Sequence, residues 1–254
     1  MQVRVRDRRP FTILLVALIA LAWLALWAWG RSPYSRYLGH QHLDAVLGGD
    51  RALLPVFVGS WTLMTVAMML PTSLPLIVLF AAIARRHPDW PALVGLLIAG
   101  YLGAWTLFGL LAHLGDLALH GVVERSARLS THAWAIGAAT LLVAGLYQFT
   151  PLKYHCLDKC RSPLGFIMAH WRGRHERRQA LLLGLRHGLY CVGCCWSLML
   201  LMFAVGVGNV GWMLTLGAAM AIEKNLPWGR RLSAPLGSAL LGWGLAIVLA
   251  ALLA

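Results

Sequence analysis

Five cysteines stand in two groups along the chain, and their thiols are the side chains best suited to chemistry. The first group is Cys156 and Cys160, four residues apart, and the second is Cys191, Cys194 and Cys195, at the start of an apolar stretch. Thiolate sulfur is a soft ligand that selects Cu(I), zinc or iron–sulfur clusters. Because each group lies beside one of two neighbouring apolar stretches, we expect membrane spans to bring all five thiols to one side of a bilayer.

A helix through the second group would bring further ligands to the same side. At about 100° per residue, His187, Met199 and Met202 fall on the side that carries the three thiols, and His155 stands beside the first group. Zinc is bound mainly by Cys, His and carboxylate side chains, so a strip of thioethers favours Cu(I). The alternative for each methionine is packing, since methionine commonly fills gaps in apolar interiors. We therefore predict a Cu(I) site, with zinc as the second candidate ion.

The same thiols also support a second hypothesis. Cys191 and Cys194 have the C-x-x-C spacing of thiol–disulfide oxidoreductases, and Cys156 with Cys160 could serve as their partner pair. Five cysteines leave one thiol unpaired, however, and the loops predicted to lie outside carry no cysteine that could receive electrons. No P-loop or hydrolytic triad stands out in the sequence. We therefore favour metal binding without enzymatic activity.

The elements that must position these residues are membrane helices. Of the 254 residues, 59% are hydrophobic and only 12% are charged, whereas a soluble domain carries about 25% charged residues. Apolar runs long enough to cross a bilayer recur along the chain. We predict an all-α, multi-pass transmembrane helix bundle in a single domain over 1–254, with about seven spans near 11–29, 54–84, 92–114, 132–150, 188–207, 211–224 and 234–253.

The Lys and Arg residues indicate the orientation of these spans. With a cytoplasmic N-terminus, 17 of the 22 Lys and Arg residues lie on cytoplasmic segments, as the positive-inside rule requires. All five cysteines would then face the cytoplasm. The formal net charge of +13 is explained by these segments, so we expect a lipid bilayer and no nucleic acid as partner. The first apolar stretch is longer than a cleaved signal peptide needs, and we interpret it as an uncleaved anchor.

The second span carries a methionine strip and two prolines. Met64 and Met68 precede Pro71 and Pro75 within a stretch that is longer than one crossing requires. Each proline removes a backbone donor, so we expect a kink or break there. A broken helix inside a membrane is tolerated where it lines a protein interior or cavity. The alternative is an ordinary proline kink. In the first case the two thioethers would extend the copper site.

Polar residues at the two membrane edges complete the candidates. Glu223, at the cytoplasmic end of the sixth span, could pair with Lys224 or Arg230, or stand near the metal. On the outer side, histidine and carboxylate side chains could release an ion, or simply be solvated. These are His40, His42, Asp44, His113, Asp116, His120 and Glu124.

Several of these motifs resemble one family of bacterial multi-pass proteins, described as predicted metal-binding integral membrane proteins. The similarity covers roughly 60–253 and rests on Met68-Met69-Leu70-Pro71, Tyr147, Pro151-Leu152-Lys153-x-x-Cys156-Leu157-x-x-Cys160-Arg161-x-Pro163, Gly188-x-x-Cys191-x-Gly193-Cys194-Cys195-Trp196-x-x-Met199 and Glu223-Lys224. The family includes membrane proteins that accompany tyrosinase-type copper oxidases and are thought to supply their copper. The resemblance implies a protein of the bacterial cytoplasmic membrane, a cytosolic metal donor and a copper-dependent oxidase as client.

Overall fold

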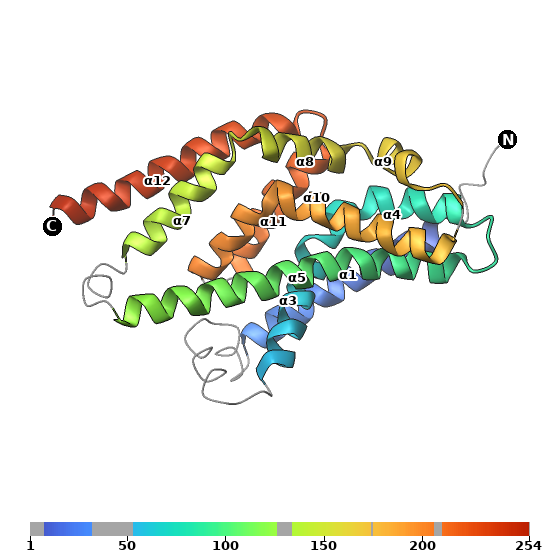
Figure 1. Ribbon diagram of the computed structural model, residues 1–254, viewed down its shortest axis with the longest axis horizontal. Coiled ribbons are helices and arrows are strands. Elements are labelled where there is room, and N and C mark those ends of the chain that lie inside the picture. Colours follow the sequence, from blue (N-terminus) through green and yellow to red (C-terminus); the bar gives the residue numbers. More distant parts are fainter. Residues whose placement is uncertain (1–7, 32–52, 126–133, 174, 206–209, 254) are drawn as a thin grey trace.

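The computed structural model describes residues 8–31, 53–125, 134–173, 175–205 and 210–253, and these residues form helices and no strand (Figure 1). In chain order the helices are α1 (Arg8–Gly30), α3 (Leu53–Met68), α4 (Leu70–Ala84), α5 (Trp90–Arg125), α7 (Trp134–Tyr147), α8 (Pro151–Arg161), α9 (Pro163–His170), α10 (Glu176–Val205), α11 (Val210–Asn225), the 3-10 turn η4 (Gly229–Leu232) and α12 (Ser233–Leu253). The predicted all-α fold is confirmed.

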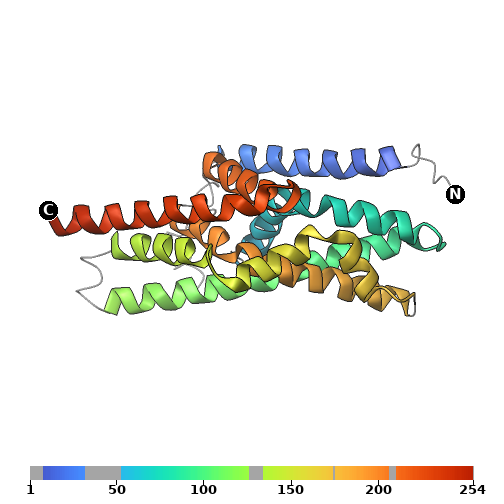
Figure 2. The ribbon, with the colours of Figure 1, turned by 90° about the horizontal axis from the view of Figure 1, so that it is seen from above.

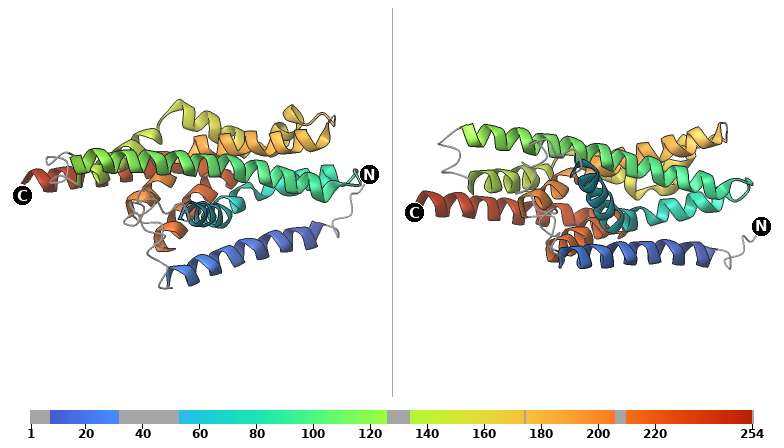
Figure 3. Two further views of the ribbon diagram at one scale, coloured as in Figure 1. Left: turned by 60° about the horizontal axis from the view of Figure 1, so that its bottom comes forward. Right: turned by 90° about the horizontal axis from the view of Figure 1, so that it is seen from below.

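Most helices run along the long axis of the molecule. Helices α7 and α12 lie side by side at one end, and α4 lies toward the other (Figure 1). Helix α1 follows one edge, where it packs on α3 and α4 (Figures 2 and 3). Helix α3 crosses the others steeply (Figure 3). Helix α10 packs on α5, α7, α8 and α11 and so links the two ends of the bundle.

Several helices are long and apolar enough to cross a membrane. Four segments qualify alone: Phe11–Ala28, Trp90–Val123, Glu176–Met202 and Gly229–Leu253. Up to six spans result if each of two bent helix pairs counts as one span. These pairs are Pro55–Met68 with Leu70–Ala84 and Trp134–Tyr147 with Pro151–Arg161. Helix α11, which covers the predicted sixth span, has 16 residues. At 1.5 Å per residue it extends only about 24 Å, short of a hydrocarbon core of about 30 Å. The count of seven spans stays a prediction.

Helices α5 and α10 form the most extensive helix–helix contact among the described residues, and glycines allow it. A Cβ atom at Gly184 would lie 1.9 Å from the carbonyl oxygen of Leu97, and one at Gly188 would lie 2.9 Å from the carbonyl oxygen of Tyr101. Small residues four apart let two membrane helices approach closely. This approach sets Tyr101 of α5 beside the turn of α10 that carries Cys191.

The predicted break in the second span is present. Helices α3 and α4 meet at Met69 with a bend of 70°. Pro71 stands in the first turn of α4 and Pro75 inside it. The carbonyl of Met69 accepts hydrogen bonds from the hydroxyls of Thr72 (2.8 Å) and Tyr101 (3.1 Å). A second helix therefore satisfies the backbone at the break, and the break faces the interior of the bundle.

The connection predicted between 150 and 188 is largely helical. Helix α8 begins directly after the fourth span, with Thr150 as its N-cap, Pro151 in its first turn and a hydrogen bond from the Lys153 amide to the Thr150 hydroxyl (3.3 Å). Helix α10 begins at Glu176, twelve residues before the predicted span. The second cysteine group consequently lies midway along a helix and not at its start.

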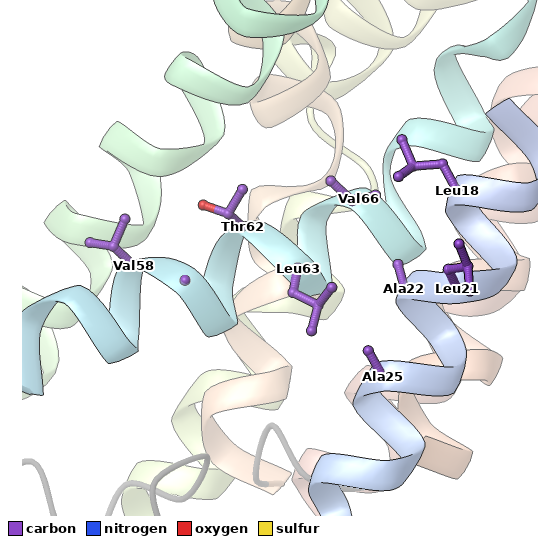
Figure 4. Close-up of a pocket in the computed structure, with 9 residues that line it drawn as sticks. Leu18, Leu21, Ala22, Ala25, Val58, Thr62, Leu63 and Val66 are labelled. Atoms are coloured by element: carbon purple, nitrogen blue, oxygen red, sulfur yellow. The ribbon is translucent and has the colours of Figure 1, made fainter. Parts of the chain in front are cut away.

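A separate apolar groove lies between α1 and α3, and Figure 4 shows its lining. Its volume is about 550 Å³. The lining side chains are aliphatic apart from one threonine: Leu18, Leu21, Ala22, Ala25, Val58, Gly59, Thr62, Leu63 and Val66. Because no sulfur or imidazole lines it, this groove is not the candidate metal site.

Candidate metal site

Helix α10 presents three thiols on one turn. The Cys194 thiol donates to the carbonyl of Cys191 at 3.1 Å, and the Cys195 thiol donates to the same carbonyl at 2.9 Å. Both sulfurs are thereby turned back toward the turn that carries Cys191. All three side chains are buried and free of disulfides.

Helix α8 adds the other two thiols. The sulfurs of Cys160 and Cys194 lie 4.0 Å apart. Cys156 packs against Gly193, where an added Cβ would lie 2.6 Å from its sulfur. Glycine at this position lets α8 approach α10. The two cysteine groups, 31 residues apart in the sequence between Cys160 and Cys191, therefore meet at one interface.

A buried ammonium group lies against these thiols. The Lys224 Nζ atom is 2.9 Å from the Cys191 sulfur and 3.7 Å from the Cys195 sulfur. It also lies 3.3 Å from the Thr72 hydroxyl and 3.9 Å from the Met69 sulfur. The Lys224 side chain is 5% exposed. A positive charge is thus held among sulfur atoms from two other elements.

Helix α5 closes the site from the other side. The Tyr101 hydroxyl lies 3.1 Å from the Cys191 sulfur. The His187 ring stacks on Tyr101 with centroids 5.7 Å apart, and its Nε2 lies 3.2 Å from the hydroxyl of Ser73. His187 therefore lies beside Tyr101, and its hydrogen bond goes to helix α4.

The four methionines proposed as ligands are all buried in the same core as the thiols: Met64, Met68, Met199 and Met202. Met68 faces Gly217 of α11. The sulfur of Met69, which sequence reasoning did not select, lies 3.8 Å from that of Cys195. The thioethers line the interior and not the lipid-facing surface, an arrangement that both a ligand strip and simple packing would give.

His155 is not brought to the thiols. Its side chain is exposed and its ring lies beside that of Tyr190, with centroids 6.1 Å apart. The turn of α8 that directs Cys156 and Cys160 toward α10 leaves His155 on the outside.

Glu223 pairs with neither of the two cations suggested from the sequence. It accepts a hydrogen bond from Lys153 at 2.7 Å in a buried ion pair, while Arg230 lies 3.6 Å from Asp158. Consecutive residues of a helix point about 100° apart, so Glu223 and Lys224 face different neighbours. The predicted pairing is wrong, and the carboxylate is turned away from the thiols.

The outer polar residues give no second site in the described part of the chain. His113 is buried and stacks on Phe57 at 4.4 Å, and Asp116 is partly exposed on the same helix. The loop residues 40–44 and the side chains of His120 and Glu124 lie outside what the structure describes. His113 is twelve residues beyond Tyr101 on α5, which is about 18 Å along the helix. It therefore lies at a distance from the thiols.

Close sulfur–sulfur contacts link α8, α10 and the bend at Met69. Across the described ranges, no three His, Cys, Asp or Glu side chains are grouped so that they could hold a metal ion. Cys160 contacts Cys194, and Cys195 contacts Met69. Structural zinc sites use four ligands in a tetrahedron, whereas a soft monovalent ion can be held by two sulfurs. Soft sulfur donors of this kind can hold either copper or zinc.

Comparison with known families decides the class of protein. A family model described as PpoB2, copper chaperone, matches residues 58–247, about three-quarters of the chain. The chain belongs to this copper chaperone family. The match includes all five cysteines, the bend at Met69 and Lys224, and it leaves out α1. No curated protein and no solved structure shows significant similarity to the chain. The family resemblance found in the sequence is confirmed, and membership supports a copper-handling role.

Three residues of the site were missed as candidates: Lys224, Tyr101 and Met69. Lys224 did carry a signal, because an ionisable residue within an apolar segment is a functional candidate by default. Its place at the end of a helix, next to Glu223, instead favours a simple ion pair. Nothing in the local sequence of Tyr101 or Met69 points to a thiol, because their contacts depend on how α5 and the bend cross α10.

Proposed function

We propose that the protein is a membrane copper chaperone that takes up Cu(I) on the cysteines of α8 and α10 and hands it on. The observation that carries this proposal is the meeting of five free thiols with a buried thioether at one helix interface. Soft sulfur ligands select Cu(I) among the common ions. Copper is the cargo, and no chemical conversion of a substrate is required.

Uptake would begin at Cys160 and Cys194. Cys160 is partly exposed, while the other four cysteines are buried. A zinc–sulfur bond is about 2.3 Å long. If a copper–sulfur bond is similar, one ion could bridge the two sulfurs, which are 4.0 Å apart, with little backbone movement. This pair is therefore suited to receive an ion from a donor.

Transfer would continue inward to Cys191, Cys195 and Met69. Beyond them, Met64, Met68, Met199 and Met202 supply further thioethers in the same core. A carrier must hold its ion tightly enough to load and weakly enough to release it. Mixed thiol and thioether sites could provide such graded binding.

The charge distribution and the family support a proposal for the direction of delivery and for the class of partners. With a cytoplasmic N-terminus the cysteines would face the cytoplasm of the bacterial cell, where a cytosolic donor could load them. The client would be a copper-dependent oxidase, reached across the membrane or at its surface. Zinc remains the second candidate ion, and the outer His and Asp residues remain candidates for release.

Copper content and thiol state, measured together on anaerobic, detergent-purified protein, test the proposal. We expect about one Cu(I) per chain in the unchanged protein and none in a Cys191→Ser, Cys194→Ser, Cys195→Ser variant. A matched His155→Asn variant should bind as the unchanged protein does. Zinc with the same cysteine dependence would keep the site but change the cargo.

A metal-free protein with a reversible Cys191–Cys194 disulfide would instead identify a thiol–disulfide oxidoreductase. Thiol exchange requires that a partner thiol reach the sulfur, and these two cysteines are each 1% exposed. The burial therefore favours the carrier over the enzyme.

The thioether path has its own test. Changing Met199 and Met202 together to Leu keeps the volume, so the cost in stability should be below about 1.5 kcal/mol for each. If the thioethers conduct copper, loading of the cysteines should persist while delivery to a client, or across the membrane of a proteoliposome, slows. Unchanged delivery would mean that these methionines only pack.

A further inference from the structure

Lys224 is a buried cation whose described partners include no carboxylate. Its four polar contacts are the Cys191, Cys195 and Met69 sulfurs and the Thr72 hydroxyl. An uncompensated charge within an apolar bundle is costly. A negative charge must therefore come from the thiols or from what they bind.

The acidic residues nearby are engaged elsewhere. The carboxylate of Glu223, adjacent in sequence, is held by the buried Lys153 at 2.7 Å. Asp158 of α8 faces Arg230 at 3.6 Å, and it is about half exposed. Neither carboxylate is directed at the Lys224 ammonium. Among the described groups, the Lys224 ammonium therefore contacts only sulfur atoms and the uncharged Thr72 hydroxyl.

We propose that Lys224 is the counter-charge of the bound cargo and makes the site selective for a soft monovalent cation; this inference rests on the proposed copper-carrier function. A monovalent ion held by two thiolates carries one net negative charge. The ammonium of Lys224 cancels it, so the loaded site is neutral. When no ion is bound, one thiolate and the Lys224 ammonium together also carry no net charge.

The two thiolates are those of Cys191 and Cys195, which lie 2.9 and 3.7 Å from the ammonium. Met69, 3.8 Å from the Cys195 sulfur, can add a third ligand without adding charge. The geometry therefore offers two charged ligands, one neutral ligand and one counter-charge.

A divalent ion on these two thiolates does not fit this balance. Zinc bound by Cys191 and Cys195 is already neutral, and the ammonium beside it would remain uncompensated in a buried, apolar setting. At this pair of thiolates Lys224 thus disfavours divalent ions while it favours Cu(I). Ligand softness alone would not separate copper from zinc so sharply, because thiolates bind both.

Removing the charge tests the inference. The variants are Lys224→Leu, which removes the charge without adding a sulfur atom, and Lys224→Arg, which keeps the charge. Lys159→Leu is the matched control, since Lys159 is an exposed lysine of α8. Affinities for Cu(I), Ag(I) and Zn(II) are measured on anaerobic detergent-purified protein, by competition with a chromogenic chelator for each metal.

We expect Lys224→Leu to lower the affinity for Cu(I) and Ag(I) by about tenfold to a hundredfold, the range for a lost charge-assisted contact. Zn(II) binding should stay the same or tighten, so the Cu(I)-to-Zn(II) affinity ratio falls. Lys224→Arg and Lys159→Leu should keep the ratio of the unchanged protein. Because the ratio is measured on one sample, partial unfolding cannot imitate its change.

The inference is overturned if Lys224→Leu binds Cu(I) within about twofold of the unchanged protein, or if Cu(I) and Zn(II) weaken equally. Lys224→Gln, with a polar and uncharged side chain, repeats the comparison should the Leu variant prove unstable. Failure of the unchanged protein to bind Cu(I) at all would refute the copper-carrier function itself. The two failures are therefore distinguishable.

Discussion

Two buried lysines of this bundle have opposite surroundings. Lys153 of α8 donates to the carboxylate of Glu223 and to the side-chain carbonyl of Gln148, and Ser233 donates to the same carboxylate at 2.7 Å. Lys224 of α11 is surrounded instead by sulfur and hydroxyl groups. The first cation is fully matched by the protein, whereas the second is matched only when sulfur carries charge.

This difference distinguishes a structural lysine from a lysine at the candidate site. The ion pair of Lys153 with Glu223 joins α8 to α11, and neither charge is available to a ligand. A cation without a carboxylate is a stability cost unless something else supplies the charge. Glu223, the partner of Lys153, and Lys224 are consecutive residues of α11, so the same turn of α11 would serve both structure and cargo.

The largest expected effect on stability comes from removing the carboxylate partner of Lys153, so that this lysine, like Lys224, has none. Glu223→Gln leaves a buried ammonium without its carboxylate, and we expect a loss of about 3–5 kcal/mol in the free energy of unfolding. Thermal or denaturant unfolding in detergent measures it. The double variant Lys153→Met, Glu223→Leu should recover most of that stability, because replacing a whole buried pair is often neutral. If the Glu223→Gln protein is as stable as the unchanged one, Lys153 does not depend on the Glu223 carboxylate and the proposed difference between the two lysines is wrong.

A smaller effect should follow from shifting α10 against α5, which moves the thiols but not the Lys153 pair. Gly184→Ala places a Cβ 1.9 Å from a backbone oxygen of α5, and overpacking costs about 1–3 kcal/mol. Cu(I) affinity should fall together with stability.

Gly103→Ala is the control for that substitution, since an added Cβ there meets nothing within 4 Å. Alanine is favoured over glycine in a helix by about 1 kcal/mol, so this variant should be as stable as the unchanged protein or more so. Equal behaviour of the two variants would show that the close approach does not position the site.

Tyr101→Phe should produce a milder change around Lys224. It removes the hydroxyl that contacts the Cys191 sulfur and the Met69 carbonyl. One lost hydrogen bond is worth about 1 kcal/mol, which corresponds to roughly fivefold in Cu(I) affinity. Chelator competition measures the affinity and thermal unfolding the stability. An unchanged affinity would mean that the hydroxyl serves only the bend.

His155→Asn should change neither lysine environment. The ring is exposed beside Tyr190, so both Cu(I) affinity and stability should match the unchanged protein within experimental error. A lower copper affinity would return His155 to the set of ligands, in line with its position in the sequence beside Cys156.

The sequence alone predicts the helical class, the bend near Pro71 and the grouping of the cysteines, because hydropathy, proline and spacing are local signals. The start of α10 was missed since its first turns are basic and lack the apolar run that marks a span. The roles of Lys224 and Tyr101 depend on helices crossing at a close, glycine-lined contact. Such crossings leave no periodic pattern in any one segment, although the Gly184 and Gly188 pair could have indicated where α10 is approached.

The unequal exposure of the thiols has a consequence for covalent chemistry. Modification of a cysteine depends on access as well as thiolate character, and Cys160 is partly exposed while the other four are buried. A maleimide reagent should therefore consume Cys160 well before the rest, and peptide mass analysis after brief labelling can count the order. Oxidants that reach the protein would attack the same sulfur first. The cysteine proposed to receive copper first would then also be the first that oxidative stress inactivates. Copper uptake would stop while the buried sulfurs stay unmodified.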